Sequence, residues 1–362
     1  MAERANDGPT QETPAPRRYM PQLDGLRAIA VAMVAYFHWV PKEFHYGINF
    51  GYAGVQLFFV LSGFLITQIL LDCRERNDKG YALRAFYARR FLRIFPLFYL
   101  VLAVAYVVDL PPVRESIHWH VTYLSNVCYF RTNSFHGAIS HFWTLAVEEQ
   151  FYVVWPAVVL WLPGRWLKPT VISLVLAGLV CRFATPSLFP ESKMTSVLPI
   201  CNFDSLGLGA LLAFTMANRL PSHWLRPLFA ALPIYAIVEI SSRFGMDQAP
   251  ARWLKHCALM LGFTWLIHRA AVGFTGLAGS VLEIGWLMYL GRISYGLYLI
   301  HNFAPLVIRP VTKSVGVAPD GLVYYAVLTA VTISVAAASW RFFESPLNGM
   351  KKWFPYSRRS PS

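Results

Sequence analysis

The sequence predicts an all-α integral membrane protein with about ten transmembrane helices and both termini in the cytoplasm. Hydrophobic residues make up 56% of the 362 residues and charged residues only 14%, whereas about a quarter of a soluble domain is normally charged. The apolar residues gather in stretches of roughly 18–24, long enough to cross a ~30 Å hydrocarbon core. These observations favour a polytopic membrane protein over a soluble one.

The candidate spans follow one another along the chain, separated by short polar connections. The longest connection covers 109–141, and its WHVTYLSNVCYF portion is typical of a short interfacial or re-entrant segment. The seventh span is short, and polar residues interrupt the ninth. The spans are expected at residues 22–40, 52–71, 91–108, 142–162, 170–184, 199–217, 228–240, 254–269, 285–308 and 322–342.

The domain organisation is expected to be simple. Residues 1–20 are polar, contain Pro14 and Pro16 and lack the apolar core of a signal peptide, so they predict a disordered cytoplasmic tail. One membrane domain is expected over 21–345, followed by a second cytoplasmic tail over 346–362. No repeat of fixed period is visible.

The net charge of +13 is explained by topology. With the N-terminus inside, the cytoplasmic segments hold roughly twice as many Lys and Arg residues as the outer segments, the bias expected of membrane proteins. Nucleic acid is therefore not needed as a partner. The five cysteines are scattered and show no CxxC spacing, so they predict neither a metal site nor a disulfide framework.

The first predicted span, LDGLRAIAVAMVAYFH (23–38), carries Arg27 and His38. Eleven residues of helix place the two side chains only ~20° apart around the axis and ~16 Å apart along it. Charged groups at this depth cost a few kcal/mol and usually mark function. The alternatives are that Arg27 pairs with Asp24 one turn earlier or reaches the interface, and that His38 is structural.

The fourth predicted span, HFWTLAVEEQFYVVWP (141–156), contains Glu148 and Glu149. It enters the membrane from the outside, so the glutamates lie at about the depth of His38. Consecutive helical residues point about 100° apart, so only one of them need face the histidine. A His–carboxylate pair suits general-base chemistry, and the alternative is a hydrogen-bond network that only holds helices together.

An arginine cluster precedes the third span, in RAFYARRFLRIFP (84–96). Guanidinium groups match the geometry of phosphate oxygens, so Arg89, Arg90 and Arg93 are candidate ligands of a phosphate-bearing donor that arrives from the cytoplasm. The alternative is that they anchor the helix to anionic lipid.

Other polar side chains lie where lipid would not tolerate them. GRISYGLYLIHN (291–302) must face inward, with its serine, second tyrosine, histidine and asparagine on one helical face. The histidine can equally be structural. GVQLFFVLSGFLIT (54–67) contains Ser62, a candidate ligand contact to which no activating base can be assigned. CNFDSLGLGALLAF contains Asp204, a weaker candidate for a buried acid. The supporting candidates are Ser62, Ser294, Tyr298, His301, Asn302 and Asp204.

Taken together, these blocks resemble the acyltransferase type 3 family. LDGLRAIAVAMVAYFH, FFVLSGFLIT, RRFLRIFP, HFWTLAVEEQFY and GRISYGLYLIHN occur in the family's order, and with FFESP (342–346) they cover nearly the whole chain. Members are multi-pass membrane enzymes that move acyl groups, most often acetyl, from cytoplasmic acyl-CoA to hydroxyls of glycans, lipopolysaccharide, Nod factors or macrolides. Many relatives continue into a soluble esterase-like domain, which this chain is expected to lack.

The resemblance implies roles for individual residues. The family's Arg-x10-His motif falls on Arg27 and His38, its arginine block on 89–93 and its acidic block on 148–149. His38 would take the proton of the acceptor hydroxyl or carry the acyl group, and Arg27 would steer the donor. The implied donor is acyl-CoA, most often acetyl-CoA, with a glycan or glycolipid acceptor, no metal, and a place in the bacterial inner (plasma) membrane.

Two other function classes fit part of the pattern. A proton-coupled transporter or flippase could use the same buried His, Glu and Arg residues, although paired helices broken by Gly or Pro are not found in the two halves. A non-catalytic scaffold gives no reason for a histidine and two glutamates at one depth. The sequence leaves open the acceptor, the length of the acyl group and the oligomeric state.

Overall fold

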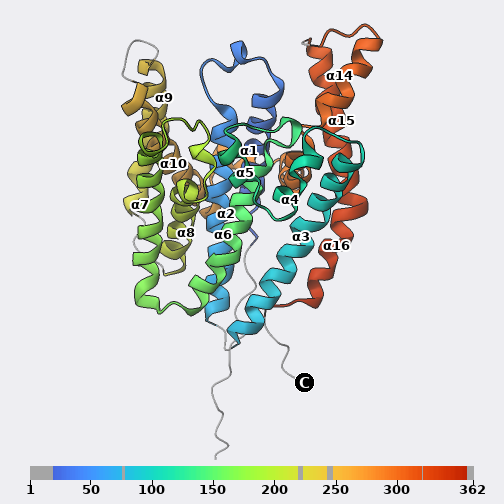
Figure 1. The fold of residues 1–362 in the computed structure, drawn as a ribbon. Helices are drawn as coiled ribbons and strands as arrows, with labels where there is room; N and C mark the ends of the chain where they lie inside the picture. Colours follow the sequence, from blue (N-terminus) through green and yellow to red (C-terminus); the bar gives the residue numbers. More distant parts are fainter. Residues whose placement is uncertain (1–18, 76–77, 219–222, 243–247, 320, 357–362) are drawn as a thin grey trace, which may run out of the picture.

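The computed structural model describes residues 19–75, 78–218, 223–242, 248–319 and 321–356. Within these ranges the chain forms helices and no strand (Figure 1), which confirms the all-α class. Nearly all of the expected N-terminal tail lies outside the described residues, as does the end of the expected C-terminal tail.

Sixteen α-helices are assigned along the described ranges, joined by short 3-10 segments and by one π-helical turn at Trp340–Glu344. They are α1 (Pro21–Trp39), α2 (Phe50–Arg74), α3 (Lys79–Val107), α4 (Val113–Val121), α5 (Ser125–Thr132), α6 (Phe142–Trp161), α7 (Gly164–Leu188), α8 (Phe203–Ala217), α9 (Ala231–Ser241), α10 (Gln248–Val272), α11 (Gly276–Leu282), α12 (Gly285–Arg292), α13 (Ser294–Ile300), α14 (Ala304–Ser314), α15 (Leu322–Ser339) and α16 (Ser345–Gly349).

Several of these helices are suited to crossing a membrane. Among the described residues five are long and apolar enough, and a sixth is added if residues 251–272 and 276–282, bent by 86°, count as one span. The chain is thus a multi-pass helical protein, while the total of ten spans and the cytoplasmic side of both termini stay predictions. The five are Phe50–Arg74, Lys79–Val107, Gly164–Leu188, Ile200–Ala217 and Leu322–Trp353.

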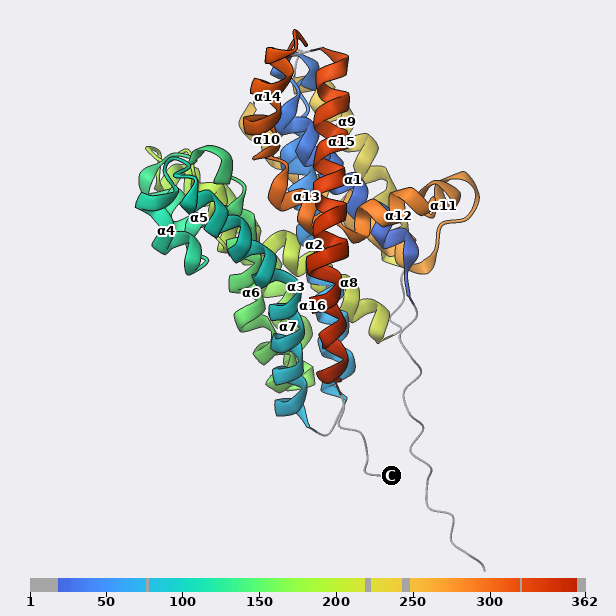
Figure 2. The same ribbon diagram turned by 90° about the vertical axis from the view of Figure 1, so that its right-hand side faces the viewer.

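The expected ninth span, 285–308, is wrong as a single helix. The chain there forms α12, α13 and the start of α14, which point in different directions (Figure 2). The breaks fall at polar residues whose backbone binds neighbouring helices. The carbonyl of Arg292 accepts a hydrogen bond from Arg93 at 3.5 Å, and the carbonyl of His301 accepts one from the Trp39 indole at 2.8 Å. A straight helix would keep both carbonyls within its own ladder.

Helix α2 lies at the centre of the molecule, packed against α1, α6 and α8 (Figure 1). Glycines allow this close approach. A Cβ on Gly63 would lie 2.0 Å from the carbonyl oxygen of Leu206 in α8, and one on Gly54 would lie 2.6 Å from that of Ala30 in α1. A larger residue at either position would push the helices apart.

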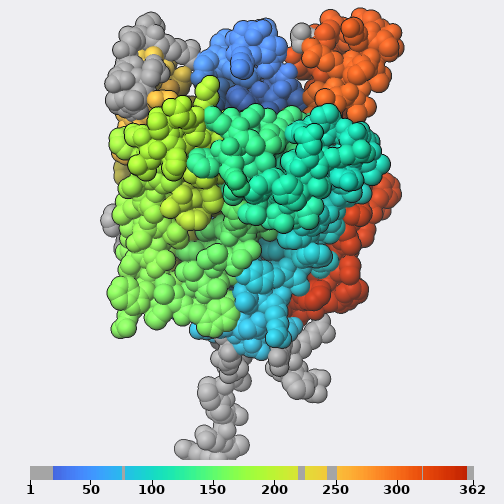
Figure 3. All heavy atoms as spheres, in the orientation of Figure 1, coloured from blue at the N-terminus to red at the C-terminus, as the bar shows by residue number. Residues whose placement is uncertain are grey.

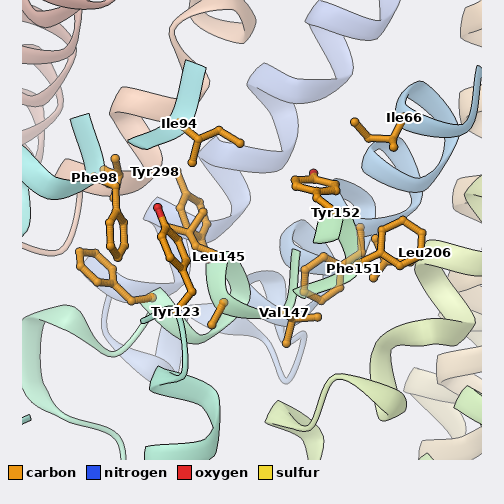
Figure 4. Close-up of a cluster of buried hydrophobic side chains, with 14 of the residues drawn as sticks. Ile66, Ile94, Phe98, Tyr123, Leu145, Val147, Phe151, Tyr152, Leu206 and Tyr298 are labelled. Carbon is orange, nitrogen blue, oxygen red and sulfur yellow. The ribbon is translucent and has the colours of Figure 1, made fainter. Parts of the chain in front are cut away.

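The connection between α3 and α6 spreads over the upper part of the face seen in Figure 3. Beneath it, aromatic side chains from this connection and from the neighbouring helices form one buried cluster (Figure 4). Tyr123 stacks on Phe98 with ring centroids 4.4 Å apart. The cluster also includes Tyr152 and Tyr298, which line the cavity described next. The hydrophobic core therefore supplies part of the wall of the site.

Candidate active site

A cavity of about 1160 Å³ opens between α1, α2, α3, α6 and α13. Because these helices are far apart in sequence, only the fold brings their polar residues together. Nine of the predicted site residues line this cavity, whereas His38, His301, Asn302 and Asp204 do not, and their functional roles stay predictions. The predicted residues along its wall are Arg27, Ser62, Arg89, Arg90, Arg93, Glu148, Glu149, Ser294 and Tyr298.

Glu148 is surrounded by cations and hydroxyls. Arg90 and Arg27 are the charged groups that act on its carboxylate, and the hydroxyls of Tyr152 and Ser62 hydrogen-bond to it. The Arg90 guanidinium also lies over the Tyr152 ring, 4.6 Å from its centroid. Opposite charges favour one another at such distances when they lie in a medium of low dielectric constant. Glu148 thus balances the arginines of the cavity.

The three clustered arginines have different surroundings. Arg93 lies 5.4 Å from the centroid of the Trp340 ring and donates to the carbonyl of Arg292. Arg89 donates to the carbonyls of Lys351 and Phe354 at 2.8 and 3.2 Å. The segment after residue 345, expected as a tail, therefore forms α16 and a 3-10 turn that contact α3.

His38 lies at the other end of α1 from Arg27 and belongs to a cluster of three histidines. Its Nδ1 is 3.0 Å from the carbonyl oxygen of Val34 and 3.1 Å from Nε2 of His301. The rings of His301 and His141 are 4.7 Å apart. His38 is exposed, while His301 and His141 are only 1% and 3% exposed. The cluster therefore runs from the surface into the core.

The hydrogen bonds of this cluster fix one set of neutral tautomers. His301 Nδ1 donates to the carbonyl of Tyr298 at 2.6 Å, so its Nε2 must accept from Nδ1–H of His38, which also points at the Val34 carbonyl. His141 Nε2 donates to the carbonyl of Leu299 at 3.2 Å. The Nε2 atom of His38 thus keeps its lone pair, and no described residue hydrogen-bonds to it.

The structure does not bring His38 to either glutamate. The polar partners of His38 among the described residues are the Val34 carbonyl and His301, and those of Glu148 are Arg90, Arg27, Ser62 and Tyr152. The reason is that α2 packs against both α1 and α6 and so lies between them, while α13 packs directly on α1. His38 and the two glutamates were predicted at about the same depth in the membrane, but they are not in contact.

One layer of side chains lies between the cavity and the histidines. Tyr298 and Thr144 both line the cavity, and their hydroxyls are 2.6 Å apart. On its other side the Tyr298 ring is 5.5 Å from His301 and 5.4 Å from His141. Asn302 donates to Nδ1 of His141 at 3.3 Å and so holds that ring. The cavity and the histidine cluster are adjacent.

Asp204 lies elsewhere, in a buried ion-pair network. Its carboxylate accepts hydrogen bonds from Arg182 at 3.0 Å and from His256 at 2.6 Å. Neither partner lines the cavity. Within the described residues no group of three or more His, Cys, Asp or Glu side chains is arranged to hold a metal ion.

Several residues of the site were absent from the sequence-based candidates. His141 is the first residue of the HFWTLAVEEQFY block and Arg292 is the second residue of GRISYGLYLIHN. Both therefore stood in motifs from which only neighbouring residues were chosen. Tyr152 lies four residues after Glu148, so helical spacing would have placed it on the same face of the helix as that glutamate. Lys351 also lines the cavity. No feature of the sequence marked it as a site residue, because it follows the last apolar stretch.

The fold and the cavity define a multi-pass helical membrane protein with a charged chamber among its helices. The model of a family described as an acyltransferase domain matches residues 20–341. The chain therefore belongs to the acyltransferase type 3 family that its motifs resemble.

Curated relatives carry names that describe acetyl transfer. The peptidoglycan O-acetyltransferase OatA of Listeria monocytogenes is 29% identical over 93% of this chain, and the O-acetyltransferase OatA of Staphylococcus aureus is also 29% identical over 93%. The match covers 57% and 58% of these two relatives, so this chain spans a little over half of their length. No solved structure matches the chain significantly.

Proposed function

We propose that this chain is a membrane-bound O-acyltransferase. It moves an acyl group, most often acetyl, from cytoplasmic acyl-CoA to a hydroxyl of an extracytoplasmic or membrane-associated glycan, in the inner (plasma) membrane of a bacterium. Family membership and the names of the relatives support the reaction class, and peptidoglycan is the first acceptor to test. The single observation that carries the proposal is the arginine-lined cavity adjacent to a histidine with a free Nε2 lone pair.

The donor is proposed to lie along α1. Arg27 and His38 are separated by about 16 Å of helix rise, so an extended thioester carrier can hold its phosphates near the arginines and its acyl group near the histidines. Arg27, Arg90 and Arg93 would bind phosphate oxygens, for which the guanidinium fork is suited. The acyl arm would pass the Thr144–Tyr298 layer, so the Tyr298 side chain must turn aside during transfer.

His38 is proposed as the general base. Its Nε2 takes the proton of the acceptor hydroxyl while that oxygen attacks the thioester carbonyl. The carbon–sulfur bond then breaks and the proton passes to the departing thiolate, which leaves an O-acyl ester and free coenzyme A. The Val34 carbonyl and His301 hold the imidazole in the required tautomer. Glu148 keeps Arg90 and Arg27 in place.

Labelled acetyl-CoA tests this proposal in membranes that contain the full chain. Wild-type membranes should transfer label to glycan as an alkali-labile ester, with a mass gain of one acetyl group, and His38→Ala should remove the transfer. Full transfer by His38→Ala would remove the histidine from the mechanism. Movement of a solute across sealed vesicles without any acyl transfer would instead support the transporter or flippase.

A further inference from the structure

The C-terminal segment 350–356 forms part of the cavity wall. Arg89 on α3 donates to the carbonyls of Lys351 and Phe354 at 2.8 and 3.2 Å, and its guanidinium lies 4.9 Å from the centroid of the Tyr356 ring. Lys351 and Tyr356 both line the cavity. These contacts fix a segment without any long apolar run against a membrane-spanning helix. Arg89 therefore positions this segment, and its donors are already partly used.

The segment brings one more cation into a positive region. The charged groups that act most strongly on the Lys351 ammonium are Arg93, Arg90, Arg89 and Arg27, all of them cations. Carboxylates are present as well: Glu148 and Glu149 act on Arg90, and Asp24 and Glu344 act on Arg93. Asp24 also accepts a hydrogen bond from the Tyr19 hydroxyl at 2.5 Å. Asp72 and Glu75 also line the cavity, but neither belongs to the four charged groups that act most strongly on Lys351.

Such a gathering of like charges among membrane helices costs free energy unless an anion is bound. The five cations gathered at Lys351 lie on α1, on α3 and on the C-terminal segment, so they suit a ligand whose negative groups are spread over several positions. Flexible lysine and planar arginine side chains on several sides can contact different phosphates of one molecule. The arrangement thus favours an organic di- or polyphosphate over a single carboxylate.

We propose that Lys351 binds the phosphates of the donor, and that the C-terminal segment anchored by Arg89 delivers it to the cavity. This inference rests on the proposed function and divides the predicted arginine cluster: Arg90 and Arg93 contact phosphate, whereas Arg89 is a positioning residue. The donor site is then incomplete without residues 350–356.

Lys352 provides a matched control. It is the next residue and carries the same charge, but it is exposed, does not line the cavity, and its ammonium lies 5.9 Å from the Trp353 ring centroid. Lys351→Gln and Lys352→Gln therefore make the same chemical change on the same short turn. A difference in affinity between the two variants is therefore due to the position of Lys351 in the cavity and not to the loss of one surface charge.

Calorimetric titration of the purified full chain in nanodiscs, with coenzyme A and with inorganic pyrophosphate as probes, tests the inference. Lys351→Gln should weaken binding of both probes about tenfold, the effect of losing a hydrogen bond between charged groups, and Lys352→Gln should stay within about twofold. Arg89→Gln should weaken binding as well. Combined with Lys351→Gln it should add little, because both changes remove the same contact.

The outcomes separate this inference from the proposed function. Equal affinities for the two lysine variants would overturn the role of Lys351, even if the wild type transfers acetyl from acetyl-CoA. Binding of pyrophosphate that depends on Lys351, without binding of coenzyme A, would keep the phosphate site and overturn acyl-CoA as the donor. Additive losses in the Arg89 and Lys351 double variant would overturn the positioning role of Arg89.

Discussion

Nδ1 of His38 lies 3.1 Å from Nε2 of His301, which joins the end of α1 to the end of α13. A second imidazole thus takes the position where many catalytic histidines have a carboxylate. A neutral ring accepts the Nδ1 hydrogen as a carboxylate does, but it adds no negative charge to stabilise an imidazolium. His301 therefore orients the His38 imidazole as a carboxylate would, but it contributes little electrostatic stabilisation to the protonated ring.

His301 should act on the rate through His38. His301→Leu removes the acceptor of the His38 Nδ1 hydrogen, so we expect kcat to fall about tenfold, within what a positioned base contributes. KM for acetyl-CoA should change little, because His301 does not line the cavity. His301→Gln offers an oxygen in the same place and should restore most of the rate. Initial rates in membranes check this, and equal losses for Leu and Gln would contradict it.

Glu148 should matter for stability as well as for activity. Glu148→Gln removes the acid that acts on Arg90 and Arg27, and a buried group that loses such a partner typically costs about 1–3 kcal/mol of stability. Adding Arg90→Met should recover part of that loss, because both charges are then gone. Thermal unfolding of the purified variants in detergent measures it. A double variant less stable than either single one would rule out the pairing.

The sequence predicted which residues form the cavity better than it predicted their partners. Arg27 and Glu148 were chosen because charge in a span is costly, and the same cost makes such groups gather away from lipid. Arg90 was chosen because clustered guanidinium groups match phosphate oxygens. Helical rise gave the depth of His38 and of Glu148, but not the helix between them. That α2 separates α1 from α6 depends on close glycine contacts of α2 with α1 and α8, and the sequence does not say which helices will meet there.

Asp204 should serve stability and not catalysis. It was a candidate site residue, yet its partners are Arg182 and His256, outside the cavity. Asp204→Asn should lower the free energy of unfolding by about 3–5 kcal/mol, with unchanged kcat per folded molecule. Asp109→Asn is the control, because its 3.0 Å ion pair with Arg114 is exposed and worth at most about 1 kcal/mol. A loss of kcat without a loss of stability would return Asp204 to the site.

Cys181 and Cys201 should be joined readily by oxidation. They are scattered in the sequence but meet because the 3-10 turn Ile200–Asn202 before α8 packs against α7, and their Sγ atoms lie 2.7 Å apart. Diamide would take one hydrogen from each thiol and form the disulfide with little backbone movement. Closing this short loop should stabilise the fold by about 3 kcal/mol. Peptide mapping should find the two cysteines linked, and Cys181→Ser should abolish the link. Free thiols after diamide treatment would contradict the contact.

His120, in the connection between α3 and α6, should make the fold sensitive to acid. Its ring is fully buried between Tyr129 and Phe142, and neither ring nitrogen has a hydrogen-bond partner among the described residues. Burial, followed by the charges of His136 and His118, lowers the pKa of His120 to about 4. An unfolded histidine has a pKa of about 6.5. Between these values the unfolded chain takes up a proton that the folded chain refuses.

The contribution of His120 to stability should therefore be constant above about pH 6.5 and fall as the pH drops toward 4. The loss from His120 approaches 3 kcal/mol, at about 1.4 kcal/mol for each pH unit. His120→Phe keeps an aromatic ring in the same space and removes the titrating group, so its stability should fall less steeply over this range. Thermal unfolding between pH 4 and pH 7 compares the two proteins, with His136 and His118 present in both. Parallel curves would mean that the His120 imidazole is already protonated, or hydrated, inside the fold.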